Sequence, residues 1–423
     1  MLAGRRAGGK RKGREEMMNA YGLRKIMRAV TAVFALVLAT AGLTQAADGM
    51  RWVGTWASSV QEVEAGLMPD NYQDLNDTTI RQVVRVSIGG SQARIRLSNA
   101  FGGNGDLRID SISMALSTGG NGIDEASAKT ITFHGEPAVV IPGGTMMVSD
   151  PVDFDVKPGT DLVVSLHVQN ATRRVSGHRS ARGPATFFLS GNHAAEKELP
   201  DSTVNNCWYY LGGVDVLVPE KGAAILCLGD SITDGKGSTE GENRRWPDML
   251  ARRLLADEAY AHIGVLNQGI GGNNLWRGGL GQPVMQRMER DVLGQPSIKW
   301  LIVLEGINDL GGSRAQADDL IRVYEQIIIR AHDRGLKVYG STVLPCGESF
   351  YFRPGVEEQR QKVNEWIRTC GLFDAVIDWD AVVRDPENPA NLLPAADSGD
   401  HLHLSDAGYQ MMVDALDLSL FKD

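Results

Sequence analysis

The sequence predicts two structural parts, an all-β region followed by an α/β region with a parallel sheet. From Trp52 to about Pro219, short apolar or alternating runs are broken by Gly, Asn, Asp and Pro, with almost no helical periodicity. From Ala223 onward, apolar strand-like runs alternate with amphipathic segments. A chain of 423 residues is too long for one ordinary hydrophobic core, so its length also favours two domains.

The first 46 residues have the pattern of an export signal. Basic residues at Arg24, Lys25 and Arg28 precede an apolar run over 29–43, and small residues at 44–46 offer a cleavage site. The run is short for a bilayer span, and polar sequence follows it. We therefore expect residues 1–46 to be a cleaved signal region, and the mature protein to be secreted or periplasmic without a membrane span.

An uncleaved anchor is the alternative interpretation of this segment. Residues 1–17 are unusual for a signal, so Met17, Met18 or Met27 can be the true start. No cysteine follows the apolar run at the cleavage point, which argues against a lipid-anchored form.

The charge of the chain argues against binding to nucleic acids or anionic membranes. The formal charge of the whole chain is −9, and residues 1–46 contain nine Lys or Arg and two Asp or Glu, so the chain without them carries −16. The expected partner is a small-molecule or glycan ester, and we expect no cofactor and no metal.

Four cysteines are present, and their spacing is not that of a zinc site. Cys227 lies in an apolar run and is expected to be a buried thiol. In an oxidising compartment a pair could form a disulfide, but the sequence does not determine which of Cys207, Cys227, Cys346 and Cys370 would pair.

Residues 48–218 are expected to form a β-sandwich or jelly-roll domain. The predicted strands are Val53–Ser58, Ile80–Ile88, Ala93–Ser98, Ile112–Leu116, Thr130–Phe133, Leu162–Val168 and Thr186–Leu189. Two glycine clusters, at 102–105 and 119–122, are interpreted as hairpin turns. A phosphate-binding loop would need a Lys-Thr or Lys-Ser pair and a following helix, which neither cluster has.

Residues 222–423 are expected to form the α/β domain, with 214–222 as the connection. The predicted strands are Ala223–Leu228, Ile263–Asn267, Trp300–Leu304, Lys337–Leu344 and Ala375–Ile377. One intervening helix is expected to have a capping box of Ser313 and Gln316 in front of it and to end at Gly335, with an apolar stripe at Leu320, Ile321, Tyr324, Ile327 and Ile328. A second is expected over about 356–370, and a last one is capped by Ser405. Strands that alternate with helices predict a parallel sheet covered on both faces.

Four short polar segments follow predicted strands or precede the last helix. They are Gly229-Asp230-Ser231, the loop 267–273, Gly306-Ile307-Asn308-Asp309 and Asp400-His401-Leu402-His403. Ligands of open parallel sheets bind at the carboxyl ends of the strands, so these segments are expected to lie near one another. In a turn, residues i and i+3 approach, which brings the Asp400 carboxylate within reach of the His403 ring.

Together the four segments supply the parts of a serine acyl-transfer site. Such a site needs a serine, a base, a group that orients the base, and donors for the oxyanion. Each segment alone also has a structural interpretation: Ser231 as a helix N-cap, Asp230 and Asp234 as turn residues, and glycines 269, 271 and 272 as loop formers. Their joint occurrence in this order favours catalysis.

These residues resemble the blocks of the SGNH (GDSL) hydrolase superfamily, over roughly 223–421. The motifs on which the resemblance rests are GDSITDG, NQGIGGN, GIND and DHLH. This combination is far more specific than GDS alone. The longer string from Gly229 to Leu254, with a β region that opens on WVGTWASS, is similar to a branch of arylesterases and acylhydrolases found among xylan-degrading enzymes.

The resemblance implies a flavodoxin-like hydrolase domain and a role for each matched residue. Ser231 would be the nucleophile, His403 the general base and Asp400 its orienter. The oxyanion hole would consist of the backbone N–H groups of Ser231 and Gly272 and the side-chain amide of Asn308. Gly272 is assigned in preference to Gly269.

Other chemistries have weaker support. His401 and His403 are two residues apart, a spacing that metal ligands can have, but no further histidine or carboxylate has a spacing that matches it. His401 is therefore interpreted as a pocket neighbour or a solvated residue. GDSIT lacks the closing glycine of the G-x-S-x-G elbow, and 269–272 is not a dinucleotide-binding G-x-G-x-x-G.

The sequence does not identify the substrate-binding residues. Aromatic side chains could stack on a sugar or an aryl group, or pack in the core; they are Trp246, Trp276, Phe350, Tyr351 and Phe352. Arg179 and Arg182, near His178, are candidates to reach the site from the β region or to be solvated.

The leading hypothesis is a serine carboxylic-ester hydrolase that removes short acyl groups, possibly acetyl, from a glycan or another small ester. A lipase, thioesterase or acyltransferase with the same residues is the close alternative. A non-catalytic carbohydrate-binding surface protein is the alternative from a different class. The acyl group, the alcohol, the oligomeric state and the role of the β region are not determined by the sequence.

Overall fold

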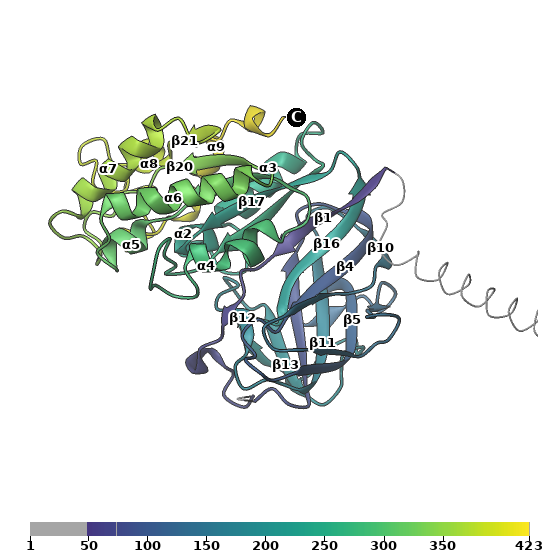
Figure 1. Cartoon of the computed structure of the whole chain (residues 1–423). Helices are drawn as coiled ribbons and strands as arrows, with labels where there is room; N and C mark the ends of the chain where they lie inside the picture. The colour runs from purple at the N-terminus through teal and green to yellow at the C-terminus, as the bar shows by residue number, and fades with distance from the viewer. Residues whose placement is uncertain (1–48, 73, 423) are drawn as a thin grey trace, which may run out of the picture. The chain divides into compact units, whose positions relative to one another are not determined.

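The computed structural model describes residues 49–422 with the exception of residue 73 (Figure 1). The chain from Gly49 onward forms one compact unit. The predicted signal region, residues 1–46, lies outside the described residues. Within the described part, no helix has the length and apolar character that crossing a membrane requires. The division of the chain at residues 218 and 222 stays a prediction.

Residues 50–219 are β-rich and their strands pair antiparallel, which confirms the β character predicted for this region. The first sheet has the order β1 (Met50–Ala57), β16 (Leu211–Pro219), β4 (Gly90–Ser98), β10 (Val152–Val156), with β9 (Met146–Val148) paired to β4. The second has the order β14 (Thr203–Asn205), β13 (Thr186–Ser190), β3 (Thr78–Arg85), β11 (Asp161–Asn170), β5 (Leu107–Gly119), β6 (Gly122–Ile123), with β7 (Lys129–Thr130) and β8 (Val139–Ile141) paired to β5. A short third sheet has the order β15 (Trp208–Tyr209), β12 (Ser176–His178), β2 (Gln61–Glu62).

Alternation along the central strand β11 shows how the sequence builds this region. Leu162, Val164 and Leu166 lie in the main hydrophobic core, whereas Val163 belongs to a small separate cluster. Side chains of successive strand residues point to opposite faces, so this division follows directly from the sequence. A jelly-roll connectivity stays a prediction.

Two predictions about the connections of the β region are wrong. The cluster at 119–122 is a hairpin that joins β5 to β6, as predicted, but the cluster at 102–105 links β4 of the first sheet to β5 of the second and is not a hairpin turn. The segment 214–219 is not a connection either. It belongs to β16, which lies between β1 and β4 and is buried along almost its whole length, so only residues 220–222 separate β16 from the next strand.

The second half contains the predicted parallel sheet. Its strands are, in spatial order, β18 (Ile263–Gly269), β17 (Ala223–Gly229), β19 (Ile298–Leu304), β20 (Lys337–Ser341) and β21 (Ala375–Ile377). Numbered along the chain, this order is 2-1-3-4-5, the flavodoxin-like order, in which ligands bind beside the first strand at its carboxyl end. β17 is completely buried, as its apolar sequence AAILCLG predicts.

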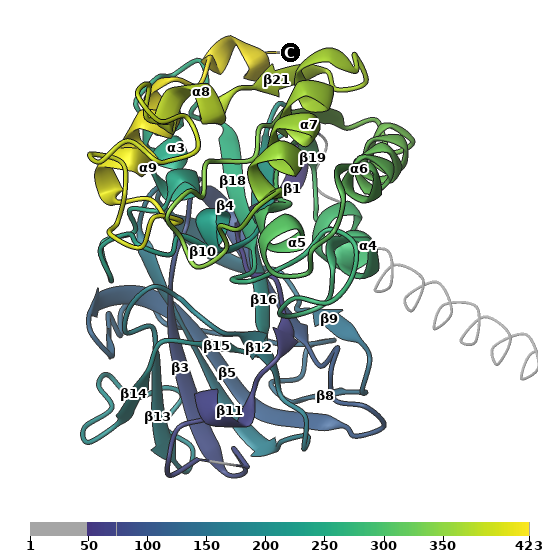
Figure 2. The same ribbon diagram turned by 90° about the vertical axis from the view of Figure 1, so that its left-hand side faces the viewer.

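Helices cover both faces of this sheet, with α3 and α9 on one side and α6 and α7 on the other (Figure 2). The α-helices are α2 (Ser231–Asp234), α3 (Trp246–Leu255), α4 (Val284–Arg287), α5 (Ile307–Gly311), α6 (Ala317–His332), α7 (Val356–Thr369), α8 (Trp379–Val383) and α9 (Asp406–Asp414). Short 3-10 or π-helical segments are η1 (Ala65–Leu67), η2 (Met288–Leu293) and η3 (Leu418–Phe421). Ser405 caps α9 as predicted, but the capping box of α6 runs from Gln316 to Asp319 instead of from Ser313 to Gln316.

Strand β1 of the antiparallel region lies directly against β18 of the parallel sheet. A Cβ atom at Gly264 would lie 2.6 Å from the carbonyl oxygen of Gly54, so the two backbones approach where neither residue has a side chain. Nearby, the Val265 N–H donates to the Ser87 hydroxyl at 3.0 Å. These contacts lie near the amino end of β17, where Ala224 and Ile225 pair with Gly264 and Val265.

Candidate active site

Ser231 begins α2 directly after β17, at the carboxyl edge of the parallel sheet. The N-cap of α2 is Asp230, whose side chain accepts from the Ile232 N–H at 2.9 Å. The interpretation of Ser231 as the N-cap is therefore wrong, and its hydroxyl is free for another partner. Gly229 permits the tight exit from the strand, because a Cβ there would lie 2.7 Å from the Leu304 carbonyl oxygen.

Ser231, His403 and Asp400 form one hydrogen-bonded line. The Ser231 Oγ lies 2.8 Å from His403 Nε2, and His403 Nδ1 lies 2.6 Å from Asp400 Oδ2. The other oxygen of Asp400 accepts from the His403 N–H at 2.8 Å. The predicted approach of residues i and i+3 is thus present, and it holds the ring with Nε2 directed at the serine.

The surroundings keep His403 neutral and Asp400 charged near neutral pH. Burial lowers the pKa of the His403 ring below 6.5, against the opposing effect of the Asp400 carboxylate. Partial burial would by itself raise the pKa of Asp400, but the hydrogen bonds from the His403 backbone and ring outweigh it and lower the pKa. A neutral imidazole can accept the serine proton, which is the state that a general base requires.

Backbone donors for an oxyanion are present at Ser231 and Gly272. Ser231 is the first residue of α2, so its N–H has no acceptor within the helix. Gly272 lines the same cavity as Ser231 and has a φ of 74°, a conformation that glycine adopts without strain. The alternative donor, Gly269, already donates its N–H to Asn267 Oδ1 at 2.9 Å and lies within β18.

The amide of Asn308 is oriented by two partners that the sequence did not indicate. Its Nδ2 donates to Asp230 Oδ2 at 3.2 Å, and its Oδ1 accepts from the Tyr351 hydroxyl at 2.8 Å. An amide nitrogen carries two hydrogens, so one N–H remains for a ligand in the cavity that Asn308 lines. Tyr351 therefore lies in the site as a residue that positions Asn308.

Three buried carboxyl groups support the loops beneath the site. Burial raises the pKa of Asp230 to about 7 and the pKa of Asp309 to about 6, and it raises that of Glu305 well above its usual value. Asp309 accepts from the N–H groups of Leu275 and Trp276, which ties the loop after Gly272 to α5. The buried Arg287 guanidinium lies 3.6 Å from Glu305 and is the nearby positive charge.

The β region is connected to α2 by a buried cluster of charges. Asp234, three residues after Ser231, accepts from Arg182 at 2.5 Å, and its other oxygen lies 2.9 Å from His178 Nε2. His178 Nδ1 lies 2.8 Å from the Ser59 carbonyl oxygen. The ring therefore links the Asp234 carboxylate of α2 to the backbone of the β region.

The same charges determine the ionisation of Asp234. Burial by itself would raise the pKa of this carboxyl, but the charges of Arg182 and His178 outweigh it and hold the pKa at about 2. We call Asp234, His178 and Arg182 the interdomain clamp. The clamp shows that Asp234 is more than the turn residue that the sequence suggested.

A cavity of about 420 Å³ opens over Ser231, within the range of small-molecule sites. Its lining comes from both halves of the chain: Leu67, Arg179, Ser180, Arg182, Asn206, Ser231, Asp234, Lys236, Gly271, Gly272, Leu280, Asn308, Phe350, Tyr351, Leu402 and His403. The candidates Arg179, Arg182, Phe350 and Tyr351 thus reach it. The structure places all the predicted catalytic and oxyanion residues together, with Asp400 behind His403.

The other predicted candidates do not line this cavity. Trp246 is fully buried and packs against Trp379, with ring centroids 4.9 Å apart. Trp276 packs under Arg277, and Phe352 is an exposed side chain outside the cavity. The four cysteines are free thiols.

His401 is not a neighbour in the cavity, because its ring is half exposed and pairs with Asp397 at 2.7 Å. Across residues 49–422 apart from residue 73, no group of three or more His, Cys, Asp or Glu side chains is arranged to hold a metal ion.

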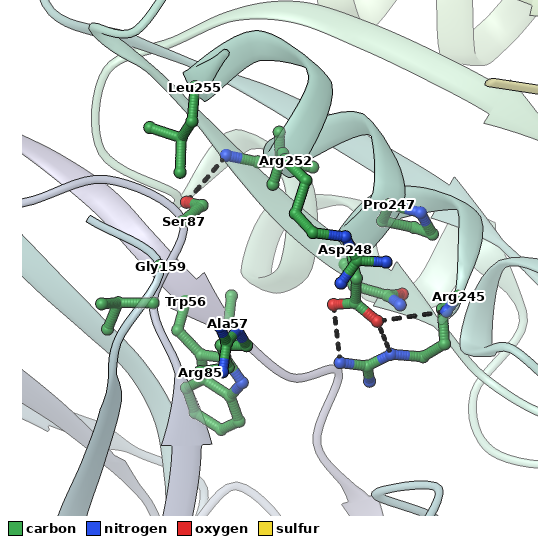
Figure 3. A pocket seen from close by; sticks show the side chains of 14 residues that line it. Trp56, Ala57, Arg85, Ser87, Gly159, Arg245, Pro247, Asp248, Arg252 and Leu255 are labelled. Carbon is green, nitrogen blue, oxygen red and sulfur yellow. Dashed lines mark hydrogen bonds and ion pairs between the residues drawn. The ribbon is translucent and has the colours of Figure 1, made fainter. Parts of the chain in front are cut away.

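A second cavity lies between β1 and α3, away from Ser231 (Figure 3). Trp56 and Arg85 line it from the β region, and Arg245 and Asp248 line it from the other side. Figure 3 shows Arg245 hydrogen-bonded to Asp248 at its edge. Its volume of about 40 Å³ is enough for a few water molecules but not for an ester substrate.

Comparison with protein families identifies the part of the chain that carries Ser231 and His403. Residues 227–411 match the model of the GDSL-like Lipase/Acylhydrolase family. No curated protein sequence matched the chain.

Three of the solved structures that are similar to this chain are described by their sequence identity, TM-score and coverage. A carbohydrate acetylesterase family member from Sinorhizobium meliloti is 18% identical, with a TM-score of 0.38, and the match covers 47% of this chain and 97% of that one. A GDSL-like lipase from Bacteroides thetaiotaomicron is 17% identical, with a TM-score of 0.38, and the match covers 48% of this chain and 90% of that one. A catalytic mutant of an acetylxylan esterase from Geobacillus stearothermophilus is 21% identical, with a TM-score of 0.36, and the match covers 46% of this chain and 93% of that one.

Proposed function

We propose that this chain, whose residues 227–411 form a GDSL-like lipase/acylhydrolase domain, hydrolyses short acyl esters through Ser231 as nucleophile. The observation that carries the proposal is the line of contacts from Ser231 through His403 to Asp400 at the wall of an open cavity. A nucleophile, its base and the group that orients the base are thereby in contact before any substrate binds.

In the first half of the reaction, His403 Nε2 accepts the Ser231 proton while Oγ attacks the ester carbonyl carbon. The carbonyl oxygen becomes an oxyanion held by the Ser231 and Gly272 N–H groups and by the free N–H of Asn308. Collapse of this intermediate breaks the bond to the alcohol, which leaves with the proton from His403. In the second half, His403 deprotonates a water molecule that attacks the carbonyl carbon of the acyl-enzyme. The bond from this carbon to Ser231 Oγ then breaks, Oγ takes the proton back from His403, and the acid is released.

A serine-directed fluorophosphonate probe tests the nucleophile. Labelling is expected in the native enzyme and absent from the Ser231→Ala variant, with a fall in kcat of roughly 10⁴-fold or more. Ser238→Ala is the matched control, because Ser238 is a buried neighbour whose hydroxyl donates to the Gly235 carbonyl oxygen. Labelling that persists without Ser231 would contradict its assignment as the nucleophile, whereas no labelling of the native chain would favour the non-catalytic binding protein.

The substrate that we propose is an acyl ester of a glycan, with acetyl as the acyl group. A cavity lined from both halves of the chain offers room for a sugar, and the exposed Phe350 offers a ring face. Acetate release from acetylated oligosaccharides should exceed, per enzyme, the hydrolysis of long-chain acyl esters and thioesters. Turnover of long acyl chains alone would favour the lipase or thioesterase alternative.

We further propose that the chain is exported and that residues 48–218 and 222–423 form two domains of the mature enzyme. The support for export is the basic and apolar pattern of residues 1–46. Expression of the full chain in a bacterial host, with fractionation and N-terminal sequencing, tests this. Mature protein that begins near Ala47 outside the cytoplasm is expected, whereas an intact N-terminus in the membrane fraction would favour an uncleaved anchor.

A further inference from the structure

The cavity over Ser231 has the opposite charge to the chain as a whole. Its lining contains three cationic side chains, Arg179, Arg182 and Lys236, and one acidic side chain, Asp234. Asp234 is already neutralised by the interdomain clamp. In a chain of net charge −9, a positive cavity is a local feature that attracts anions to this one place.

Two of these cations make few or no ion pairs and hydrogen bonds with other residues in the described part of the chain. Lys236 follows α2 and is exposed, and its ammonium has no ion pair in the described part of the chain. Arg179 follows β12, and its Nη2 lies 3.5 Å from the half-exposed Glu64, a long contact. The Nη1 of Arg179 is buried and has no hydrogen-bond partner among the described residues. A buried guanidinium nitrogen without an acceptor is costly, and an anionic ligand would remove that cost.

Lys236 lies beside the His403 end of the site, where the alcohol leaves. Its backbone N–H donates to the Ser231 carbonyl oxygen at 2.8 Å, its side chain lines the same cavity as His403, and its charge acts on the His403 ring. His403 transfers its proton to the departing alcohol, whereas the oxyanion faces Gly272 and Asn308. The half of the ester nearest Lys236 is therefore the alcohol half.

We propose that the preferred substrate is an ester whose alcohol half carries a carboxylate, such as an acylated uronic-acid unit of a glycan. Lys236 and Arg179 bind the carboxylate, and Leu280 and Phe350 line the same cavity and contact the apolar face of the ring that bears it. This inference rests on the proposed esterase function and narrows its substrate class.

A matched pair of small esters tests the charge directly. 3-(4-Acetoxyphenyl)propanoate and its primary amide have nearly the same size and shape but differ in charge, and a phenyl ring and two methylene groups separate that end from the reacting ester. At low salt, kcat/KM should be about tenfold higher for the carboxylate, and the ratio should approach one in about 1 M salt, where charges are screened. A ratio near one at low salt would overturn the inference, whereas no hydrolysis of either ester would overturn the proposed function itself.

Single variants assign the preference to the two cations. Lys236→Gln and Arg179→Gln should each lower the carboxylate-to-amide ratio by about threefold, and the double variant should bring it near one. Lys337→Gln is the matched control, because Lys337 begins β20 at the opposite edge of the sheet and its loss should leave the ratio unchanged. A ratio that all three variants leave unchanged would contradict the assignment.

A natural substrate pair provides the second measurement. Acetate release from acetylated oligosaccharides that contain uronic acid should exceed release from neutral acetylated oligosaccharides of the same length. Methyl esterification of the uronic acid carboxyl should remove this difference. A preference that survives esterification would show that the sugar, and not its charge, is recognised.

Discussion

The ring of His403 lies between Ser231 and Asp400, and its environment sets the pH at which the serine can react. Burial favours the neutral ring, while the Asp400 carboxylate favours the charged one, and burial has the larger effect. The base is therefore in its active, deprotonated form at neutral pH.

The pH profile of kcat/KM should show this balance. We expect kcat/KM to rise with pH along a single limb with a midpoint below 6.5, because His403 must lose its proton to act as a base. Asp230, with a pKa near 7, is the other nearby group that titrates in this range, and an Asp230→Asn variant should keep the midpoint of the limb. A midpoint above 6.5 in the native enzyme would contradict the assignment.

We expect Tyr351 to affect turnover through the hydrogen bond that it donates to Asn308. Tyr351→Phe keeps the ring but removes the hydroxyl that holds Asn308 Oδ1 at 2.8 Å. The loss of one hydrogen bond, about 1 kcal/mol, should lower kcat by roughly fivefold to tenfold and leave KM nearly unchanged. Tyr339→Phe, which removes a hydroxyl bonded to Leu420 outside the cavity, is the control. An equal effect of both variants would indicate a general loss of stability instead.

The sequence predicted the candidate catalytic positions because they obey a rule of chain topology. Ser231, Gly272 and Asn308 each follow a parallel strand, and such strand ends meet at one edge. The sequence indicated Tyr351 only as a possible stacking face and did not indicate Lys236, because no local pattern separates a cavity side chain from a core or surface one. For Trp246 the sequence left stacking and core packing open, and the structure places this indole in the core.

At the scale of elements, the interdomain clamp joins the β region to the first turn of the helix that carries Ser231. Asp234 belongs to α2, while His178 belongs to β12 and Arg182 to the loop after it. Asp234 lies 56 residues after His178 and 52 residues after Arg182 in the sequence. Local sequence patterns do not indicate which charged side chains so far apart will be in contact in the folded chain.

Removal of the Asp234 charge should affect both stability and turnover. Asp234→Asn removes the buried negative charge that pairs with Arg182 and His178, which typically costs about 3–5 kcal/mol. We expect Tm to fall by roughly 5 °C and kcat to fall by roughly tenfold or more, because α2 positions Ser231. Differential scanning calorimetry and steady-state kinetics measure the two effects.

An exposed ion pair of the β region serves as the control for this variant. Glu62→Gln breaks the contact of Glu62 with Arg174, both of which are about half exposed, and should change the free energy of unfolding by less than about 1 kcal/mol. If Asp234→Asn behaved like Glu62→Gln, the clamp would have no role in holding α2.

Among the elements, β16 is the long strand that the sequence analysis assigned to a connection. Its residues 214–218 are apolar except for Asp215, but the Gly212-Gly213 pair before them and Pro219 after them are typical of a connection. Pairing with β1 and β4 on both sides decides its structure, and this pairing is non-local. By contrast, β17 and α6 were predicted from their own residues, because a long apolar run and a helical stripe are local signals.

At the scale of the whole molecule, the approach of Gly54 to Gly264 allows β1 to lie on β18. Gly264→Ala would place a methyl group 2.6 Å from a backbone oxygen that cannot rotate away. Such overpacking typically costs about 1–3 kcal/mol, so Tm should fall by several degrees. Gly66→Ala is the control, because a Cβ at Gly66 has no neighbour within 4 Å, and equal Tm values for the two variants would contradict the close approach.

Residues 220–222 join β16, an inner strand of one sheet, to β17, an inner strand of the other. A gene segment can be exchanged as a module when its boundary falls where few contacts cross. A crossover at residues 220–222 would keep the strand pairs of each sheet within one parent, but it would part β1 from β18 and Asp234 from His178 and Arg182. Recombinants with a breakpoint at this short junction should therefore keep both sheets and lose stability only where the two parents differ at these contacts, and the Tm values of a library of chimeras would measure that loss.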